Sequence, residues 1–173
     1  MQDEFRFAQG DVAGALPVMK EAARWLAAEG IPLWTEEELD VLPRQNEPGC
    51  FLTLRDGEGE SAAALLLGFE DRFFWPDVAP GTAGFLHKIA VRRKYAGRGL
   101  PGLLIGHVAG LCRERGIGTL RLDCAADRPA LRRVYERLGF VPAGEKELET
   151  KRLGRICVAL YTLDIGQRRP GEE

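Results

Sequence analysis

A group of glycines near the middle of the chain has the spacing of a phosphate-binding turn. Gly97, Gly99 and Gly102 follow an apolar run and open a segment with the periodicity of a helix. Glycine lets the backbone approach an anion closely, and the unpaired N–H groups at a helix N-terminus, together with the helix dipole, favour negative charge. The turn therefore predicts a site for the phosphates of a nucleotide cofactor.

Two classes of cofactor are bound in this way, and the flanking sequence separates them. The literal G-x-G-x-x-G pattern, with Asp123 about 20 residues further on, is typical of dinucleotide-binding folds. In those folds the first glycine follows its strand almost directly, whereas here residues 92–96 intervene. Only about 70 residues remain after Gly102, too few for the six-stranded classical form. A dinucleotide site is therefore the weaker alternative.

The elements before the turn follow from hydrophobic periodicity. Residues 5–7 alternate as in a short strand, and Asp11 caps a helix that extends as far as Gly30. Residues 35–38 have the form of a capping box and open a second helix, which Pro43 closes. Further along, residues 50–54 and 62–69 predict an antiparallel hairpin, residues 71–84 a proline-rich loop, and residues 85–91 the strand that leads into the turn.

The elements after the turn complete a mixed architecture. A helix ends at Gly116 and has its buried face at Leu103, Leu104, Val108, Leu111 and Cys112. Residues 119–124 predict a strand, and Asp127 caps a second helix with its buried face at Leu131, Val134, Tyr135 and Leu138. Residues 141–142 and 156–163 supply the closing strands. The sequence predicts one α+β domain over residues 1–166, and we expect the charged residues 167–173 to form a disordered tail.

Composition excludes several classes of function. The chain has 173 residues, 45% of them hydrophobic, which is enough for one core. Its 24 basic and 26 acidic residues give a net charge of −2 and are interspersed, so we expect no nucleic-acid partner. The four cysteines are widely spaced and there are two histidines, which predicts a reduced, cytoplasmic protein without a metal site. The longest apolar run, residues 62–68, is far shorter than the roughly 20 residues that cross a bilayer.

Four segments around the turn resemble a known family. They are Leu86-His87-Lys88-Ile89-Ala90-Val91, Gly97-Arg98-Gly99-Leu100, Leu120-Arg121-Leu122-Asp123 and Tyr135-Glu136-Arg137-Leu138-Gly139-Phe140. In order and spacing they resemble the motifs of the GNAT (GCN5-related) N-acetyltransferases, and the upstream strand, helices and hairpin match the order of elements in that family. The resemblance implies a mixed, mostly antiparallel sheet, flanked by helices and splayed in the middle between strands 85–91 and 119–124.

The resemblance also implies a cofactor and the residues that hold it. Acetyl-CoA, the acyl donor, enters the split in the sheet, where the backbone of Ile89 and Val91 pairs with the pantetheine amides and the N–H groups from Gly97 to Gly102 hold the pyrophosphate. Basic side chains near the turn add positive charge around the phosphates. The residues assigned to the cofactor are Ile89, Ala90, Val91, Arg92, Gly97, Arg98, Gly99, Leu100, Gly102, Arg128 and Tyr135.

The chemistry of acetyl transfer to an amine requires a base and an acid. An aliphatic amine is mostly ammonium at pH 7, so a proton acceptor must act before attack on the thioester. His87 is one candidate, since it lies two residues before Ile89, on the same side of a regular strand, and matches by position a histidine of the arylalkylamine N-acetyltransferases. Glu70 and Asp123 are the others. Tyr135 matches the family's usual acid, which protonates the departing CoA thiolate.

The acceptor is not fixed by these motifs. Trp25, Trp34, Phe73, Phe74 and Trp75 are candidates for the walls of an acceptor pocket, with core packing as the alternative for each. The expected acceptor is a small-molecule amine or a peptide, and both a monomer and a homodimer are open. Ala96, Pro101 and Arg128 depart from the family's usual residues, so a non-catalytic acyl-CoA-binding or regulatory module is the second hypothesis. We expect no role for Cys124.

Overall fold

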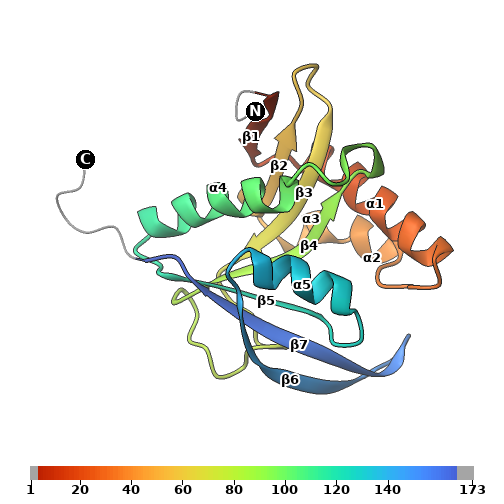
Figure 1. Ribbon diagram of the computed structural model, residues 1–173, viewed down its shortest axis with the longest axis vertical. Coiled ribbons are helices and arrows are strands. Elements are labelled where there is room, and N and C mark those ends of the chain that lie inside the picture. The colour runs from red at the N-terminus through yellow and green to blue at the C-terminus, as the bar shows by residue number, and fades with distance from the viewer. Residues whose placement is uncertain (1–3, 167–173) are drawn as a thin grey trace. The chain divides into compact units, whose positions relative to one another are not determined.

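The computed structural model describes residues 4–166 and has the expected α+β fold (Figure 1). Seven strands form a mixed sheet in the order β1-β2-β3-β4-β5-β7-β6. Strands β1 and β2, β2 and β3, β5 and β7, and β6 and β7 pair antiparallel, whereas β4 and β5 pair parallel. The strands are β1 (Arg6–Gln9), β2 (Phe51–Arg55), β3 (Ser61–Gly68), β4 (Gly84–Val91), β5 (Thr119–Ala125), β6 (Val141–Thr150) and β7 (Gly154–Asp164).

Contacts within the chain group it into two compact units. Among the described residues, the first unit comprises residues 4–67 and 87–108, and the second comprises residues 68–86 and 109–166. Strand β4 and helix α4 (Leu100–Glu114) each contribute residues to both units. None of the helices in residues 4–166 has the length and apolar character that crossing a bilayer requires. The expected tail, residues 167–173, lies outside the described part of the chain.

The first unit is built on a core between its helices and strands. Helix α1 (Val12–Ala28) starts at Asp11, whose carboxylate accepts a hydrogen bond from the Gly14 N–H at 3.0 Å. Helix α2 (Glu36–Asp40) has the predicted capping box between Thr35 and Glu38. The apolar face of these helices packs on β2, β3 and β4 in a cluster of Ala15, Val18, Met19, Ala23, Leu39, Leu42, Phe51, Ala64, Leu66 and Ala90.

The second unit has a long hairpin at its centre. Strands β6 and β7 pair antiparallel over most of their length, and helix α5 (Pro129–Arg137) lies against β7 (Figure 1). The contact is made by the rings of Tyr135 and Tyr161, 6.5 Å apart, and by a hydrogen bond from Arg132 to the Tyr161 hydroxyl. A separate apolar cluster joins Trp75, Ala83 and Phe85.

Four sequence predictions about these elements were wrong in detail. Pro43 does not end the helical region, because it begins α3 (Leu42–Gln45), where the first turn tolerates a residue without an N–H. Arg128 and not Asp127 is the N-cap of α5, and Val134 of that helix is 37% exposed. Strand β6 has ten residues where two were predicted, because its charged side chains gave the sequence the appearance of a solvated loop.

Candidate active site

The glycine turn lies where the sequence predicted it, directly before helix α4, and two of its glycines have positive φ. Gly97 has φ of 77° and Gly99 has φ of 72°, a region that residues with a side chain rarely occupy. A Cβ atom at either position would have open space around it, so glycine is required by backbone conformation and not by crowding. Helix α4 begins at Leu100, and the Leu103 N–H donates to the Gly99 carbonyl at 3.2 Å. The N–H groups of its first turn, apart from Pro101, are thus presented at the turn.

The segment between β4 and the turn is anchored and not a free spacer. Arg93–Tyr95 form a single 3-10 turn. Tyr95 is buried, packs edge to face on Phe5 with centroids 5.8 Å apart, and donates its hydroxyl proton to Asp56. Residues 92–96 were described from the sequence only as residues between the strand and Gly97, and no role was predicted for Tyr95, because one aromatic residue among cations gives no periodic signal. Its burial fixes where the turn begins.

The basic residues near the turn have partners within the first unit. Arg92 donates from Nε to the Ser61 carbonyl at 2.7 Å and lies 3.6 Å from Glu21. Lys94 pairs with Glu60. The Arg92 side chain therefore ties β4 to β3. Only the backbone of Arg92 stays a candidate for contact with the cofactor.

Arg93 and Arg98 have guanidinium groups that lie over aromatic rings. The Arg93 guanidinium stacks over the Trp25 ring at 3.9 Å, and Arg98 lies 5.0 Å above the Phe5 ring while paired with Glu4. Both side chains are solvent-exposed. Cation–π contacts of this kind hold the charge without neutralising it, so Arg93 is the better placed of the two to attract phosphate.

Strand β4 is irregular in its middle. Lys88 has φ of 55°, the only positive φ at a non-glycine residue among those described. In a regular strand residues two apart share a face, but a left-handed residue between them breaks the alternation. The expectation that His87 and Ile89 share one side rested on a regular strand, and that condition is not met. Ile89 and Val91 are half-buried, while Ala90 packs into the core of the first unit.

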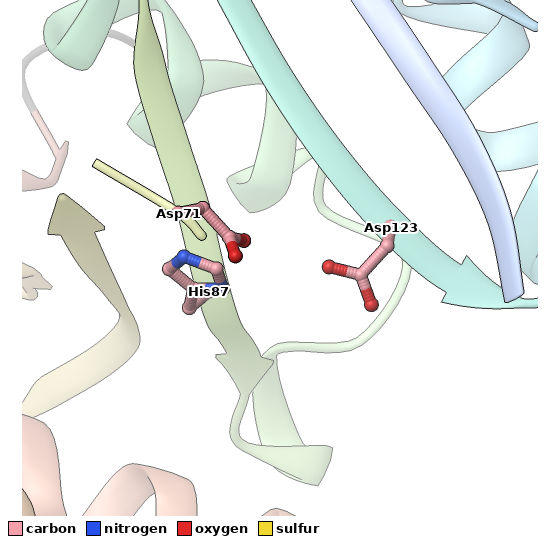
Figure 2. A group of neighbouring side chains, drawn as sticks. All are labelled: Asp71, His87 and Asp123. Carbon is pink, nitrogen blue, oxygen red and sulfur yellow. The ribbon is translucent and has the colours of Figure 1, made fainter. Parts of the chain in front are cut away.

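The parallel ladder between β4 and β5 is short and ends next to candidate bases. It covers Gly84–Leu86 on β4, and its last pair is Leu86 with Leu122. The residues that follow this pair along the two strands are His87 and Asp123, which Figure 2 draws with Asp71. Within the second unit, carboxylate oxygens of Asp71 and Asp123 lie within 4.8 Å of each other.

The carboxylates after β3 have opposite surroundings. Glu70, the predicted base, is exposed and forms an ion pair with Arg72. Asp71 is buried, and its Oδ1 accepts hydrogen bonds from the N–H groups of Phe73 and Phe74 at 3.0 and 2.9 Å. Asp71 was not singled out from the sequence, because an aspartate before a turn usually caps it, as this one does. Its burial beside Asp123 makes it a better candidate than Glu70 for work at the site.

Tyr135 lies on the buried face of α5. It is 6% exposed and packs edge to face on Phe140, with ring centroids 6.0 Å apart. Burial, reinforced by Cys124 and the charge of Asp123, raises the pKa of Tyr135 well above its ordinary value. The phenol therefore keeps its proton at neutral pH, which an acid that donates to a leaving group must do.

Cys124 and Arg128 were also singled out in the sequence, Cys124 as a residue without a role. Burial raises the pKa of Cys124 to about 11, so its thiol is not a nucleophile at neutral pH, in line with the absence of a predicted role. Arg128 is the half-buried N-cap of α5 and makes no side-chain cap hydrogen bond.

The five aromatic candidates for an acceptor wall are divided between core and surface. Trp75 is buried in the cluster with Phe85 and Phe74 packs against that cluster, so core packing accounts for both. Phe73 is 58% exposed. In the first unit Trp25 lies under Arg93, and the Lys88 ammonium is 5.1 Å from the Trp34 ring.

Comparison with known proteins accounts for this arrangement. Residues 19–140 match the model of the acetyltransferase (GNAT) family. The chain is 28% identical to an uncharacterized N-acetyltransferase, YesJ of Bacillus subtilis, over 75% of this chain and 76% of that protein. Among solved structures, a GNAT-family acetyltransferase from Listeria monocytogenes has a TM-score of 0.70 at 25% identity, covering 92% of this chain and 94% of that one. The acetyltransferase yncA from Salmonella typhimurium, solved with its cofactor acetyl-CoA, has a TM-score of 0.66 at 14% identity, with 98% of both chains covered.

The chain belongs to the GNAT acetyltransferase family. It is an acetyltransferase whose acyl donor is acetyl-CoA. This confirms the fold, the enzyme class and the cofactor predicted from the sequence, and it rejects both the dinucleotide alternative and the non-catalytic one.

Proposed function

We propose that this enzyme transfers the acetyl group of acetyl-CoA directly to a primary amine of a small molecule or a peptide. The observation that carries the proposal is the joint presence of a left-handed residue in β4 and the Gly97–Gly99 turn at the start of α4. The first interrupts regular strand geometry beside backbone groups that the pantetheine arm requires. The second supplies N–H donors to a pyrophosphate.

Most of the residues proposed to hold acetyl-CoA belong to the first unit. The backbone of Ile89, Ala90, Val91 and Arg92 receives the pantetheine, and the turn and first helical residues, Gly97, Arg98, Gly99, Leu100 and Gly102, receive the phosphates. Exposed Arg93 adds attraction for negative charge. From the second unit we retain Arg128 and Tyr135.

The proposed reaction is a single acyl transfer. A base accepts a proton from the ammonium form of the acceptor, and the free amine attacks the thioester carbonyl. The C–N bond forms, the C–S bond breaks, and Tyr135 donates its proton to the departing thiolate. His87 is our first choice as base because its ordinary pKa is close to neutral, Asp71 and Asp123 are next, and exposed Glu70 is the weakest of the predicted candidates.

A coupled assay of CoA release with a panel of amines tests the proposal. We expect release that depends on both acetyl-CoA and one class of amine, with an acetylated product of the corresponding mass. If the acylated atom were a hydroxyl or thiol of the acceptor, the amine assignment would be wrong even though the enzyme class stands. Homodimer formation, cytoplasmic location and catalysis without a metal stay predictions.

A further inference from the structure

The second unit contains a cavity that the acetyl-transfer machinery does not use. It has a volume of about 440 Å³ and is lined by Gly118, Thr119, Arg121, Thr162, Asp164 and Gly166. Thr119 and Arg121 alternate along β5 with buried Leu120 and Leu122, and they pair in register with Asp164 and Thr162 of β7. Four polar side chains therefore stand together on one face of this ladder. The volume falls within the range of small-molecule sites.

Two buried N–H donors lack acceptors, one on the lining residue Arg121 and one on Trp75, whose ring lies against the Arg121 guanidinium. Within residues 4–166, neither Nε of Arg121 nor Nε1 of Trp75 has a hydrogen-bond partner, although both atoms are buried. The two side chains touch, since the Arg121 guanidinium lies 4.8 Å from the centre of the Trp75 ring. A buried donor without an acceptor costs about 1–3 kcal/mol, and native proteins seldom leave one so. Two in contact indicate that an acceptor group belongs there.

The charged residues that line the cavity indicate which kind of acceptor group would bind there. Arg121 carries a fixed positive charge and a planar set of donors suited to the two oxygens of a carboxylate. Thr119 and Thr162 add hydroxyl donors. Asp164 has its Oδ1 accepting from the Gly166 N–H, and it brings a negative charge to the same lining, which opposes a phosphate dianion.

We propose that this cavity is a binding site for a small carboxylate monoanion, held by Arg121 with Thr119 and Thr162. None of these residues is assigned to acetyl-CoA or to acetyl transfer. The proposal therefore does not depend on which amine accepts the acetyl group.

The test is a titration followed by ¹H–¹⁵N NMR of the full chain, with sodium acetate as the minimal probe. Sodium chloride and sodium phosphate at matched ionic strength serve as comparisons. The signals to follow are the Arg121 Nε–H and the Trp75 indole N–H, with the indole signal assigned by Trp75→Phe. We expect both to shift and saturate with acetate and to stay nearly still with chloride.

Variants test whether acetate binding in the cavity causes these shifts. Arg121→Met should abolish the saturable shift of the Trp75 signal. Arg155→Met, which removes an exposed arginine of the same unit paired with Glu149, should keep it. If Arg121→Met does not fold, Thr162→Val serves instead and should weaken acetate binding about tenfold, as expected for one lost hydrogen bond to a charged ligand. Non-saturating shifts, or saturation by phosphate and not by acetate, would overturn the proposal. No step requires acetyl-CoA, so failure here is distinct from failure of the proposed transfer.

Discussion

At the scale of single residues, two buried tyrosines of the second unit offer a matched comparison. Tyr135 packs against Phe140, and Tyr161 hydrogen-bonds to Arg132 and Glu136 at 2.9 and 2.8 Å. Replacing Tyr135 by phenylalanine keeps the ring and removes the proton donor. We expect kcat to fall by about 10²-fold or more while the Kd for acetyl-CoA stays nearly constant.

Tyr161→Phe is the control for that experiment. It removes a hydroxyl that we place in structure and not in chemistry, so we expect lower thermal stability with a nearly unchanged kcat. Steady-state kinetics and calorimetric binding of acetyl-CoA measure the two variants side by side. An unchanged kcat in Tyr135→Phe would remove Tyr135 from the mechanism.

Asp11 gives a residue-scale prediction about pH. Burial opposes its ionisation, but hydrogen bonds from Arg55, Thr53 and the Gly14 N–H outweigh this and hold the pKa of Asp11 below its ordinary value. A folded-state pKa below the unfolded value of 3.8 contributes stability that is complete well above pH 4 and is lost as pH falls through the folded value.

We therefore expect Asp11→Asn to destabilise the protein by about 1–2 kcal/mol at pH 7, after allowance for the exposed part of Arg55, and by less at pH 3. Urea denaturation at both pH values measures this. Asp40→Asn is the control, because Asp40 is exposed and pairs with Lys20 at the surface, so its replacement should change stability little at either pH. An equal loss at both pH values would show that Asp11 acts as a cap and not through its charge.

At the scale of elements, one glycine before helix α4 and one within it have opposite requirements. Gly99, just before the helix, has positive φ, whereas Gly106 lies exposed in its middle with open space at the Cβ position. Gly99→Ala should cost about 1–2 kcal/mol and weaken acetyl-CoA binding, because it disfavours the turn. Gly106→Ala should stabilise the helix by up to about 1 kcal/mol. Thermal melts with and without acetyl-CoA measure both, and equal effects would contradict our account of the turn.

Strand β4 gives a second element-scale prediction at Lys88. Strand positions normally favour valine over glycine, but a β-branched residue does not tolerate the φ of 55° found here. We expect Lys88→Val to be less stable than Lys88→Gly by more than about 1 kcal/mol, since the same side-chain contact with Trp34 is lost in both. Chemical denaturation of the pair measures the difference. A more stable valine variant would mean that β4 is regular at this position.

At the scale of the whole molecule, binding of the cofactor should appear as stability. Acetyl-CoA at about 100 times its Kd adds roughly 2.7 kcal/mol to the free energy of unfolding. For a chain of this length we expect Tm to rise by about 5–10 °C, and NAD at the same concentration should leave Tm unchanged. Differential scanning fluorimetry with both ligands measures this, and a shift with NAD would contradict the assignment of the glycine turn.

Much of the fold and part of the site could be predicted from the sequence, because those features depend on neighbours along the chain. The capping box at Thr35, the cap at Asp11 and the glycine turn before α4 are local features and were predicted. The order of motifs led to the family and to acetyl-CoA. Most of the charged strand β6 was missed, because it lacks the alternation of apolar and polar residues by which a strand is predicted. Its strand conformation is held by pairing with β7.

Only the tertiary structure decided what each chemical group meets. It tied the Arg92 side chain to Ser61, placed Glu70 on the surface, and buried Asp71 near Asp123. It also placed Arg121 on the Trp75 ring with a buried, unpaired Nε. The sequence determined the caps and the glycine turn because these depend on a residue and its neighbours along the chain. The left-handed φ of Lys88 and the partner of each charge depend on contacts in space, which the order of residues does not contain.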